Sequence, residues 1–311
     1  MKLKKPKFWD YKNKNFLSIL LLPFTIPILV KKFFLNQKKF YTDKIKTICV
    51  GNIYLGGTGK TPISIKLDQI LKDLNYKTTF IKKYYPNQID EQKLLKINST
   101  LFCSRNRIES LKDAVDKNFE IAIFDDGLQD SKIKYDITFV CFNISNWIGN
   151  GQLLPAGPLR EKIISLKKYN AVFLNGNGEN TEIIKSKILE VSNSIKIFET
   201  RYQILNSNEL NRDRNYVIFS GIGNPSSFEK TLKNDNFKVI KSLHYPDHYN
   251  FSSKDILEIK KIAKSLDANI LTTEKDFLRL EEYESKDIEY IKIELLVNEE
   301  EKLIKFLQNS L

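Results

Sequence analysis

The chain has 311 residues, of which 41% are hydrophobic and 12% aromatic, and its formal net charge is +12. This length and apolar content allow one large or two medium folded domains and exclude a chain that is disordered throughout. Cys49, Cys103 and Cys141 lie far apart in apolar contexts with only two histidines in the chain, which excludes a disulfide framework and a zinc cluster. We expect all three to be core residues in a reducing cytosol. Zinc-finger spacing, an RNP motif and a recognition-helix signature are all missing, so we predict no nucleic-acid partner.

The positive charge is concentrated at the start of the chain. Residues 1–46 contain twelve lysines against two acidic residues, which leaves the rest of the chain nearly neutral. A run of fifteen uncharged, mainly apolar residues, 16–30, lies inside this basic region. It is shorter than the ~20 residues that a spanning helix needs, and Pro23 and Pro27 interrupt it. The sequence that follows, VKKFFLNQKK, has no small-residue cleavage site, which disfavours a secretory signal peptide.

We therefore predict that residues 1–44 form a membrane-associated helical segment that lies in the interface rather than across it. Its apolar residues would enter the acyl region, and its lysines would contact an anionic membrane surface, at ~1 kcal/mol for each lysine. A buried helical hairpin with a solvated rim of lysines is the alternative.

After this segment, β-like apolar runs alternate with helical stretches, which is typical of a parallel α/β sheet. We expect strands at 45–52, 77–85, 99–104, 120–126, 137–143 and 171–177, and helices at 60–74 and 108–117. A second βαβ set follows a polar, Asn-rich stretch between Glu190 and Asn215, with strands near 216–225, 237–246, 269–276 and 288–295 and helices from 227 and at 255–266. The predicted fold is a P-loop NTPase-like parallel sheet at 45–200 and a smaller α/β domain at 201–311.

The segment GNIYLGGTGKTP, residues 51–62, lies where the first strand passes into a helix. There, backbone N–H groups and the helix N-terminus can bind phosphates, Lys60 can reach the β/γ oxygens, and the Thr61 hydroxyl can hold Mg²⁺. The strict P-loop spacing would place glycine where this chain has Tyr54, and two later glycines supply the flexibility instead. A glycine-rich turn with no ligand is the alternative. The predicted ATP-binding residues are Tyr54, Leu55, Gly56, Gly57, Thr58, Gly59, Lys60 and Thr61.

A second carboxylate motif follows about 65 residues after Lys60. The run EIAIFDDGLQD ends an apolar strand with Asp125 and Asp126, where a Walker-B acid would face the Mg²⁺ held by Thr61. A turn of this composition is common by itself, but after a P-loop it predicts metal support.

These motifs and their neighbours resemble the tetraacyldisaccharide 4'-kinase family. The matching segments span most of the chain after the basic region, and the ordered set is more specific than the P-loop alone. They are VGNIYLGGTGKTP, the pair Asp90–Glu91, DDGLQ at 125–129, GNGQLLPAGPLRE at 149–161, GIGNP at 221–225, PDHYNF at 246–251 and LTTEKD at 271–276.

The resemblance implies transfer of the γ-phosphate of Mg²⁺-ATP to the 4'-hydroxyl of a tetraacylated, 1-phosphorylated glucosamine disaccharide, the lipid A precursor, to give lipid IVA. It implies a peripheral or monotopic enzyme with two α/β lobes at the cytoplasmic face of the bacterial inner membrane, and we expect no obligate protein partner. It further implies that Asp90 and His248 form the catalytic dyad that activates the hydroxyl, with Lys60 on the phosphates. From the residues alone, Asp90 would be a solvated charge in a polar loop and His248 a surface turn residue.

Arg160 and Glu161 end a Gly/Pro-rich stretch that cannot be a regular helix, which favours a functional loop near the phosphates or the sugar over a structural corner. Lys275 either contacts nucleotide or substrate or caps a helix. Arg107 either matches a family arginine after the third strand or is a surface residue. The candidate substrate contacts are Gln129, Arg160, Glu161 and Asp247.

The chain also departs from the family pattern. Family members commonly carry Ser-Arg-Gly-Tyr after the second strand, where this chain has IKKYYPN at 81–87. We expect Lys82 or Lys83 to substitute for the missing arginine. Asp130 stands where histidine is usual, and we assign it no role.

Two other classes of function remain open on the sequence. One is a P-loop NTPase or ligase-like enzyme that turns over ATP with a partner at the membrane. The other is a non-catalytic membrane protein that senses nucleotide and binds ATP without transferring phosphate.

Overall fold

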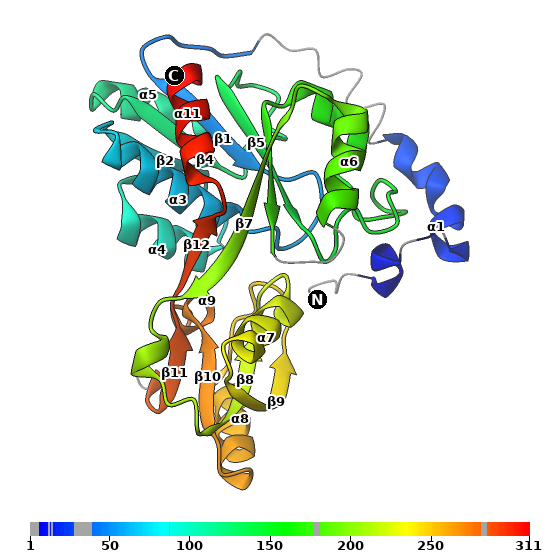
Figure 1. Ribbon diagram of the computed structural model, residues 1–311, viewed down its shortest axis with the longest axis vertical. Coiled ribbons are helices and arrows are strands. Elements are labelled where there is room, and N and C mark those ends of the chain that lie inside the picture. The colour runs from blue at the N-terminus through cyan, green and yellow to red at the C-terminus, as the bar shows by residue number, and fades with distance from the viewer. Residues whose placement is uncertain are drawn as a thin grey trace.

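The computed structural model describes residues 6–11, 13, 15–27, 39–86, 88–176, 181–280 and 285–311. They form a large and a small α/β lobe, each built on its own sheet, and an N-terminal helical segment beside the large lobe (Figure 1).

The large lobe contains an eight-stranded sheet with the order β12-β7-β6-β5-β1-β4-β2-β3. Neighbouring strands are parallel, except that β12 pairs antiparallel with β7. The predicted parallel sheet is therefore mixed, because its last strand returns from the small lobe instead of following a βαβ crossover. The strands are β1 (Lys46–Gly51), β2 (Thr78–Lys83), β3 (Leu101–Ser104), β4 (Ile121–Asp125), β5 (Ile137–Asn143), β6 (Ala171–Asn175), β7 (Lys196–Ile204) and β12 (Ile293–Val297).

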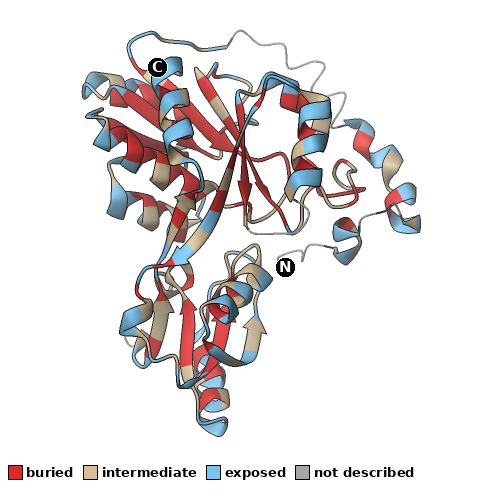
Figure 2. Cartoon of the chain, viewed as in Figure 1, coloured by how far each residue is buried: buried red, intermediate tan, exposed pale blue. Residues whose placement is uncertain are grey.

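Helices cover both faces of this sheet, so its central strands are buried on both sides (Figure 2). Ile48 and Val50 of β1 pack with α3 (Lys60–Asp73) and α11 (Glu300–Ser310) on one face. Cys49 faces the opposite side, where α5 (Arg107–Asp116) packs. On that side α6 (Thr181–Val191) and η3 (Ile163–Lys168) cover β5 and β6. Cys49 and Cys141 are buried as predicted, whereas Cys103 is only partly buried.

Two segments differ from the sequence expectation. The residues around Asp90 form helix α4 (Ile89–Asn98) rather than a polar loop, and Asp90 is buried together with Gln92 and Leu95, of which Leu95 packs into the core of the large lobe. The polar stretch near residue 200, where we expected the boundary between the two βαβ sets, contains strand β7 of the large sheet. It pairs with β6 and β12, so its alternating polar residues belong to an ordered strand.

The small lobe contains a parallel four-stranded sheet with the order β11-β10-β8-β9. The strands are β8 (Asn215–Ser220), β9 (Lys238–His244), β10 (Asn269–Thr273) and β11 (Ile288–Ile291). Helix α7 (Pro225–Asn234) packs on one face and α8 (Ser253–Ser265) on the other. The short helix α9 (Glu274–Phe277) follows β10 directly, and η4 (Ser207–Glu209) precedes β8.

Two chain crossings join the lobes, and β7 and β12 form this connection side by side (Figure 1). The Asn206 side chain donates to the carbonyl of Tyr290 at 2.9 Å and accepts from the N–H of Lys292 at 2.8 Å. The expected single strand at 288–295 is therefore divided between β11 and β12. Leu303 and Leu307 of α11 then enter the core of the large lobe. The predicted domain 201–311 thus needs correction, since residues 201–204 of β7 and the residues from 293 onward belong to the large lobe.

The N-terminal segment is helical where it is described, with η1 (Lys7–Asp10), α1 (Phe16–Leu20) and η2 (Leu22–Thr25). Among the described residues, no helix is long and apolar enough to cross a membrane. Trp9 is buried, and its indole N–H donates to the carbonyl of Pro155 at 3.0 Å. Large apolar side chains of the segment are more than half exposed: Phe16, Leu17, Ile19, Leu20, Phe24 and Ile26. Lys31, Lys32 and Lys38, which belong to the predicted basic flank, lie outside the described residues.

Candidate functional site

The predicted phosphate-binding loop connects β1 to α3, and Lys60 is the first residue of that helix. Gly59 precedes it with a φ of 83°, and a side chain there would meet Asn175 and Tyr202. Asn52 stabilises the loop by donating to the carbonyl of Gly56 at 3.2 Å and to the Thr58 hydroxyl at 3.1 Å. This role of Asn52 was not predicted from the sequence.

Two of the predicted ATP-binding residues make hydrogen bonds to other parts of the protein. The Tyr54 side chain is buried, and its hydroxyl donates to Asp10 of the N-terminal segment at 2.5 Å. The Leu55 N–H donates to the carbonyl of Pro158 at 2.8 Å. Phosphate contacts from the first part of the loop would therefore have to come from its other backbone groups, and residues 56–61 stay predicted ATP-binding residues.

Asp125 lies at the carboxyl end of β4, beside the end of β1, because Val50 pairs with it across the sheet. The Thr61 hydroxyl donates to Asp125 Oδ2 at 3.1 Å, and the Ser64 hydroxyl lies 3.5 Å from Oδ1. Asp125 is completely buried. The structure thus brings the predicted pair Thr61 and Asp125 together.

Lys82 contacts the same carboxylate from the neighbouring strand. It pairs with Asp125 across β2 and β4, and its ammonium lies 2.6 Å from Asp125 Oδ2 and 2.8 Å from Glu91 Oε2. Burial lowers the pKa of Lys82, but the two carboxylates outweigh this effect and the net shift is upward. Of the two lysines expected to replace an arginine, Lys82 reaches the site, whereas the Lys83 ammonium lies over the ring of Tyr85.

Asp126 follows with a φ of 59° and faces a different partner. Arg160 Nη1 lies 3.2 Å from Asp126 Oδ1 and donates to Gln129 Oε1 at 3.0 Å. Burial raises the pKa of Asp126, but the charges of Lys60, Arg160 and Lys82 hold it below its usual value. Gln129 is fixed in turn by donating to the carbonyl of Asn52 at 2.8 Å.

A set of charged side chains, which we call the interlobe ion cluster, joins the two lobes. Asp90 and Glu91 come from the first turn of α4 in the large lobe, and His248, Lys275 and Arg279 come from the small lobe. His248 Nδ1 lies 3.2 Å from Asp90 Oδ1. Arg279 Nη2 donates to Asp90 Oδ2 at 2.7 Å, and Lys275 Nζ lies 3.3 Å from the same oxygen. The predicted pair Asp90 and His248 is therefore assembled only when the lobes meet.

The cluster shifts the pKa of its carboxylates downward. Burial raises the pKa of Asp90, yet the hydrogen bond from His248 and the charges of Lys275 and Arg279 bring it well below the usual range. Burial also raises the pKa of Glu91, and Lys275, Lys82 and Lys60 together lower it. Both carboxylates are thus held in the ionised form.

His248 is positioned by its backbone as well as by its ring. It adopts a φ of 55°, and its N–H donates to the carbonyl of Gly221 at 3.0 Å. Arg279 fixes the same turn by donating to the Gly221 carbonyl at 2.9 Å and to Asp276 at 2.6 Å. Asp247 Oδ1 lies 3.9 Å from His248 Nε2 and 3.8 Å from the Lys275 ammonium.

Glu91 and Arg279 were not predicted as site residues, although both lie next to motifs that the sequence shows. Glu91 follows Asp90 directly, and Arg279 lies three residues after the end of the LTTEKD segment, one helical turn from Asp276. Asp90, Glu91 and His248 offer ligand atoms within 4.8 Å of one another. Because Lys275 and Arg279 already contact these carboxylates, a metal ion would have to displace them.

Glu161 and Arg107 make other contacts. The Glu161 side chain is buried and accepts from the Tyr169 hydroxyl at 3.1 Å. Arg107 is buried rather than on the surface; it donates to the carbonyl of Asp126 at 2.6 Å and pairs with Asp130 at 3.2 Å. Asp130 therefore helps to hold the turn that carries Asp126.

The phosphate-binding loop also touches the small lobe directly. A side chain at Gly223 would come within 2.4 Å of the Gly57 nitrogen and 3.0 Å of an Asp247 oxygen. The contact requires glycine at 223, and it places the GIGNP turn against the loop.

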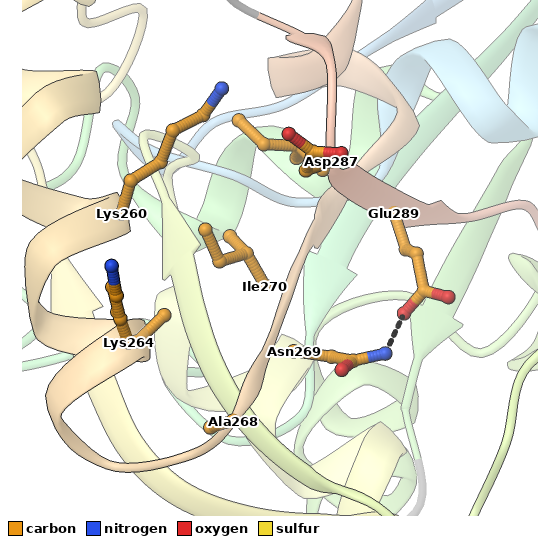
Figure 3. Close-up of a pocket in the computed structure, with 9 residues that line it drawn as sticks. Lys260, Lys264, Ala268, Asn269, Ile270, Asp287 and Glu289 are labelled. Atoms are coloured by element: carbon orange, nitrogen blue, oxygen red, sulfur yellow. Dashed lines mark hydrogen bonds between the residues drawn. The ribbon is translucent and has the colours of Figure 1, made fainter.

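A pocket of about 620 Å³, with both polar and apolar side chains in its lining, lies away from this site, in the small lobe (Figure 3). Side chains from α8, β10 and the start of β11 line it, among them Lys260, Lys264, Asn269 and Asp287. None of the residues of the interlobe ion cluster belongs to its lining.

Comparison with known proteins gives consistent matches over nearly the whole chain. A sequence profile described as LpxK, tetraacyldisaccharide-1-P 4'-kinase, matches residues 16–100 and 90–311. The chain is 53% identical over 303 residues to a tetraacyldisaccharide 4'-kinase of Pelagibacter ubique (strain HTCC1062), with 97% of this chain and 96% of the relative covered. It is 32% identical over 301 residues to a tetraacyldisaccharide 4'-kinase of Rickettsia bellii (strain OSU 85-389), with 90% of each covered.

Among solved structures, the chain is similar to the "apo" form of LpxK from Aquifex aeolicus in complex with ATP. The TM-score is 0.69 at 24% identity, and the match covers 94% of this chain and 99% of the other. This similarity supports the same fold, a P-loop NTPase-like lobe with a second, smaller α/β lobe.

Proposed function

The chain belongs to the tetraacyldisaccharide-1-P 4'-kinase family, and on this premise we propose that it transfers the γ-phosphate of ATP to the 4'-hydroxyl of tetraacyldisaccharide 1-phosphate. The product is lipid IVA, an intermediate of lipid A biosynthesis. One observation carries the proposal for the site. The Lys82 ammonium lies 2.6 Å from Asp125 and 2.8 Å from Glu91, and Glu91 lies 3.6 Å from His248 Nε2, so the end of the phosphate-binding loop and the pair Asp90–His248 belong to one site.

The phosphates of ATP would lie on the loop at residues 56–61. Backbone N–H groups at the start of α3 and the Lys60 ammonium supply positive charge where the transferred phosphoryl group carries negative charge. Arg160 and Gln129 lie on the Asp126 side of the same site, where they are candidates for the γ-phosphate or the sugar. Glu161 and Asp247 stay predicted substrate contacts.

Thr61 and Asp125 are the residues that would hold Mg²⁺. They fit this ion by their chemistry, because a hydroxyl and a buried carboxylate in contact offer the hard oxygen ligands that Mg²⁺ prefers. Bound there, Mg²⁺ would neutralise phosphate oxygens. Asp126 pairs with Arg160 and is therefore the weaker candidate of the two aspartates.

The pair Asp90–His248 would activate the acceptor hydroxyl. If His248 donates its Nδ1–H to the ionised Asp90, Nε2 on the opposite edge of the ring carries the lone pair that accepts the hydroxyl proton. Glu91 Oε1 and Asp247 Oδ1 lie 3.6 and 3.9 Å from Nε2, where they would stabilise the positive charge that the ring gains. Asp90 orients the ring and selects its tautomer.

The N-terminal segment would bring the enzyme to its acylated substrate. The exposed apolar side chains of α1 and η2 are suited to the membrane interface, and Trp9 and Asp10 anchor the segment beside the phosphate-binding loop. The proposed location is the cytoplasmic face of the inner membrane. Replacing Phe16, Leu17 and Phe24 by Ser should release the protein from anionic vesicles in sedimentation; unchanged sedimentation would contradict the insertion of these side chains.

The reaction is tested with purified protein, Mg²⁺-ATP and tetraacyldisaccharide 1-phosphate in detergent, followed by mass spectrometry. We expect a lipid product that is one phosphate heavier. ATP hydrolysis without this product would favour an NTPase, and ATP binding with neither product would favour a nucleotide sensor.

A further inference from the structure

Lys82 has an unusual position for a lysine. Its side chain is only 2% exposed, and its ammonium bridges the carboxylates of Asp125 and Glu91 at 2.6 and 2.8 Å. Buried lysines of this kind are rare unless they are paired. The register of the sheet fixes the first contact, because Lys82 and Asp125 are direct neighbours on β2 and β4.

The ammonium occupies the oxygen on which a metal ion would depend. Asp125 Oδ2 receives the Thr61 hydroxyl at 3.1 Å and the Lys82 ammonium at 2.6 Å. An oxygen of a carboxylate offers about two lone-pair sites, so these two donors use both. A Mg²⁺ ion binds its oxygen ligands at ~2.0–2.1 Å and would repel an ammonium on the same oxygen.

Lys82 also has a second carboxylate to which it can retreat. Glu91 Oε2 faces the ammonium from α4, and Lys275 contacts the other oxygen of Glu91 at 3.2 Å. A small movement of the flexible lysine chain toward Glu91 would free Asp125 Oδ2 without leaving the ammonium unpaired.

We propose that Lys82 is an internal cation that competes with the divalent metal for Asp125 Oδ2 and withdraws toward Glu91 when the metal binds. It holds Asp125 neutralised before nucleotide arrives and weakens the affinity for free metal ion. The inference rests on the proposed function only in that the metal belongs to the ATP site.

The test measures Mn²⁺ binding by the electron paramagnetic resonance signal of free Mn²⁺, with and without a non-hydrolysable ATP analogue. Lys82→Met should bind Mn²⁺ about tenfold more tightly than the wild type, which corresponds to ~1.4 kcal/mol. Lys83→Met, at the next residue, is the matched control and should leave the affinity unchanged. Equal affinity in Lys82→Met and wild type would overturn the proposal.

A second variant, Glu91→Gln, preserves the shape of the side chain and tests whether the Lys82 ammonium moves toward residue 91. Glu91→Gln removes the alternative partner, so the ammonium should stay on Asp125 and Mn²⁺ should bind more weakly. If Lys82→Met does not fold, the Glu91→Gln variant tests the proposal by itself. Mn²⁺ binding by Glu91→Gln that is as tight as in the wild type, or tighter, would overturn the proposal.

Salt distinguishes direct competition from a general effect of charge. A change in the surface charge of the protein is screened at high ionic strength, whereas a contact between buried groups such as Lys82 and Asp125 is screened much less. The gain in Lys82→Met should therefore persist between 50 mM and 500 mM KCl, and its disappearance at high salt would contradict the proposal. Since no lipid is used, a failed kinase assay and a failed Mn²⁺ test are separate results.

Discussion

The phosphate-binding loop and the interlobe ion cluster are built in different ways. The loop lies within residues 51–62 and is placed by one strand and one helix of the large lobe. The cluster joins Asp90 and Glu91 to three residues of the small lobe that lie more than 150 positions later. Local sequence therefore specifies the loop, while the cluster exists only if the lobes pack together. Variants in the phosphate-binding loop and variants in the interlobe ion cluster should therefore differ in their effects on activity and stability.

The largest effect is expected at the loop. Lys60→Ala should lower kcat/KM for phosphate transfer about 10³-fold, because it removes the cation that faces the developing charge on the phosphoryl group. Stability should change little, since Lys60 lies at the helix start. Lys302→Ala, an exposed lysine of α11, is the control. Transfer at wild-type rate in Lys60→Ala would contradict the phosphate-binding role.

Variants in the interlobe ion cluster should lower the rate slightly less than Lys60→Ala, and their effects should not be additive. Asp90→Asn and His248→Ala should each lower kcat about 10²- to 10³-fold, the range of a lost general base. If the two residues act as one unit, the double variant will be no slower than the slower single variant. Fully additive losses would show that they act independently.

Arg279 contacts Asp90 of the predicted catalytic pair and also stabilises the packing of the two lobes. Arg279→Met should lower the free energy of unfolding by about 3 kcal/mol, because it leaves the buried carboxylates of Asp90 and Asp276 without their shared partner. Urea titration followed by circular dichroism measures this loss. Lys302→Met breaks an exposed pair and should cost less than about 0.5 kcal/mol. Equal losses in the two variants would refute the structural role of Arg279.

Gly223 tests the point where loop and small lobe touch. Gly223→Ala should destabilise the protein by about 1–3 kcal/mol, because the new methyl group would overlap the backbone of Gly57. Ser226→Ala, at an exposed position in the first turn of α7, should be neutral. If Gly223→Ala keeps wild-type stability, the lobes do not pack this closely in solution.

The smallest effect concerns pH. The pKa of Asp90 is lower in the folded state than in the unfolded chain, so its carboxylate stabilises the fold above the unfolded pKa of about 3.9 and loses this contribution as pH falls toward the folded value. The stability difference between wild type and Asp90→Asn should therefore be constant from pH 7 to pH 5 and narrow below pH 4. A difference that widens on acidification would reverse the sign we infer.

Much of the fold followed from local sequence patterns. The strands from residue 46 to residue 175 and the helix that begins at Lys60 agree with the pattern of buried apolar runs, because each such strand packs between two helix layers. The P-loop was recognised despite Tyr54, since its glycines, Lys60 and Thr61 lie between a strand and a helix. The division of residues 288–295 between two sheets was not predictable, because both halves have the same apolar pattern and Asn206 makes the break from another part of the chain.

The sequence by itself determined the kind of chemistry: a phosphate-binding loop, a pair of aspartates after a buried strand, and the family motifs that name Asp90 and His248. The tertiary structure decided what surrounds these groups. It buries Lys82 on Asp125 through the register of β2 and β4, and it brings Arg279 and Lys275 onto Asp90 through the packing of the lobes. The physical reason is that the energy of an ion pair depends on distance and burial, which a local sequence pattern does not contain.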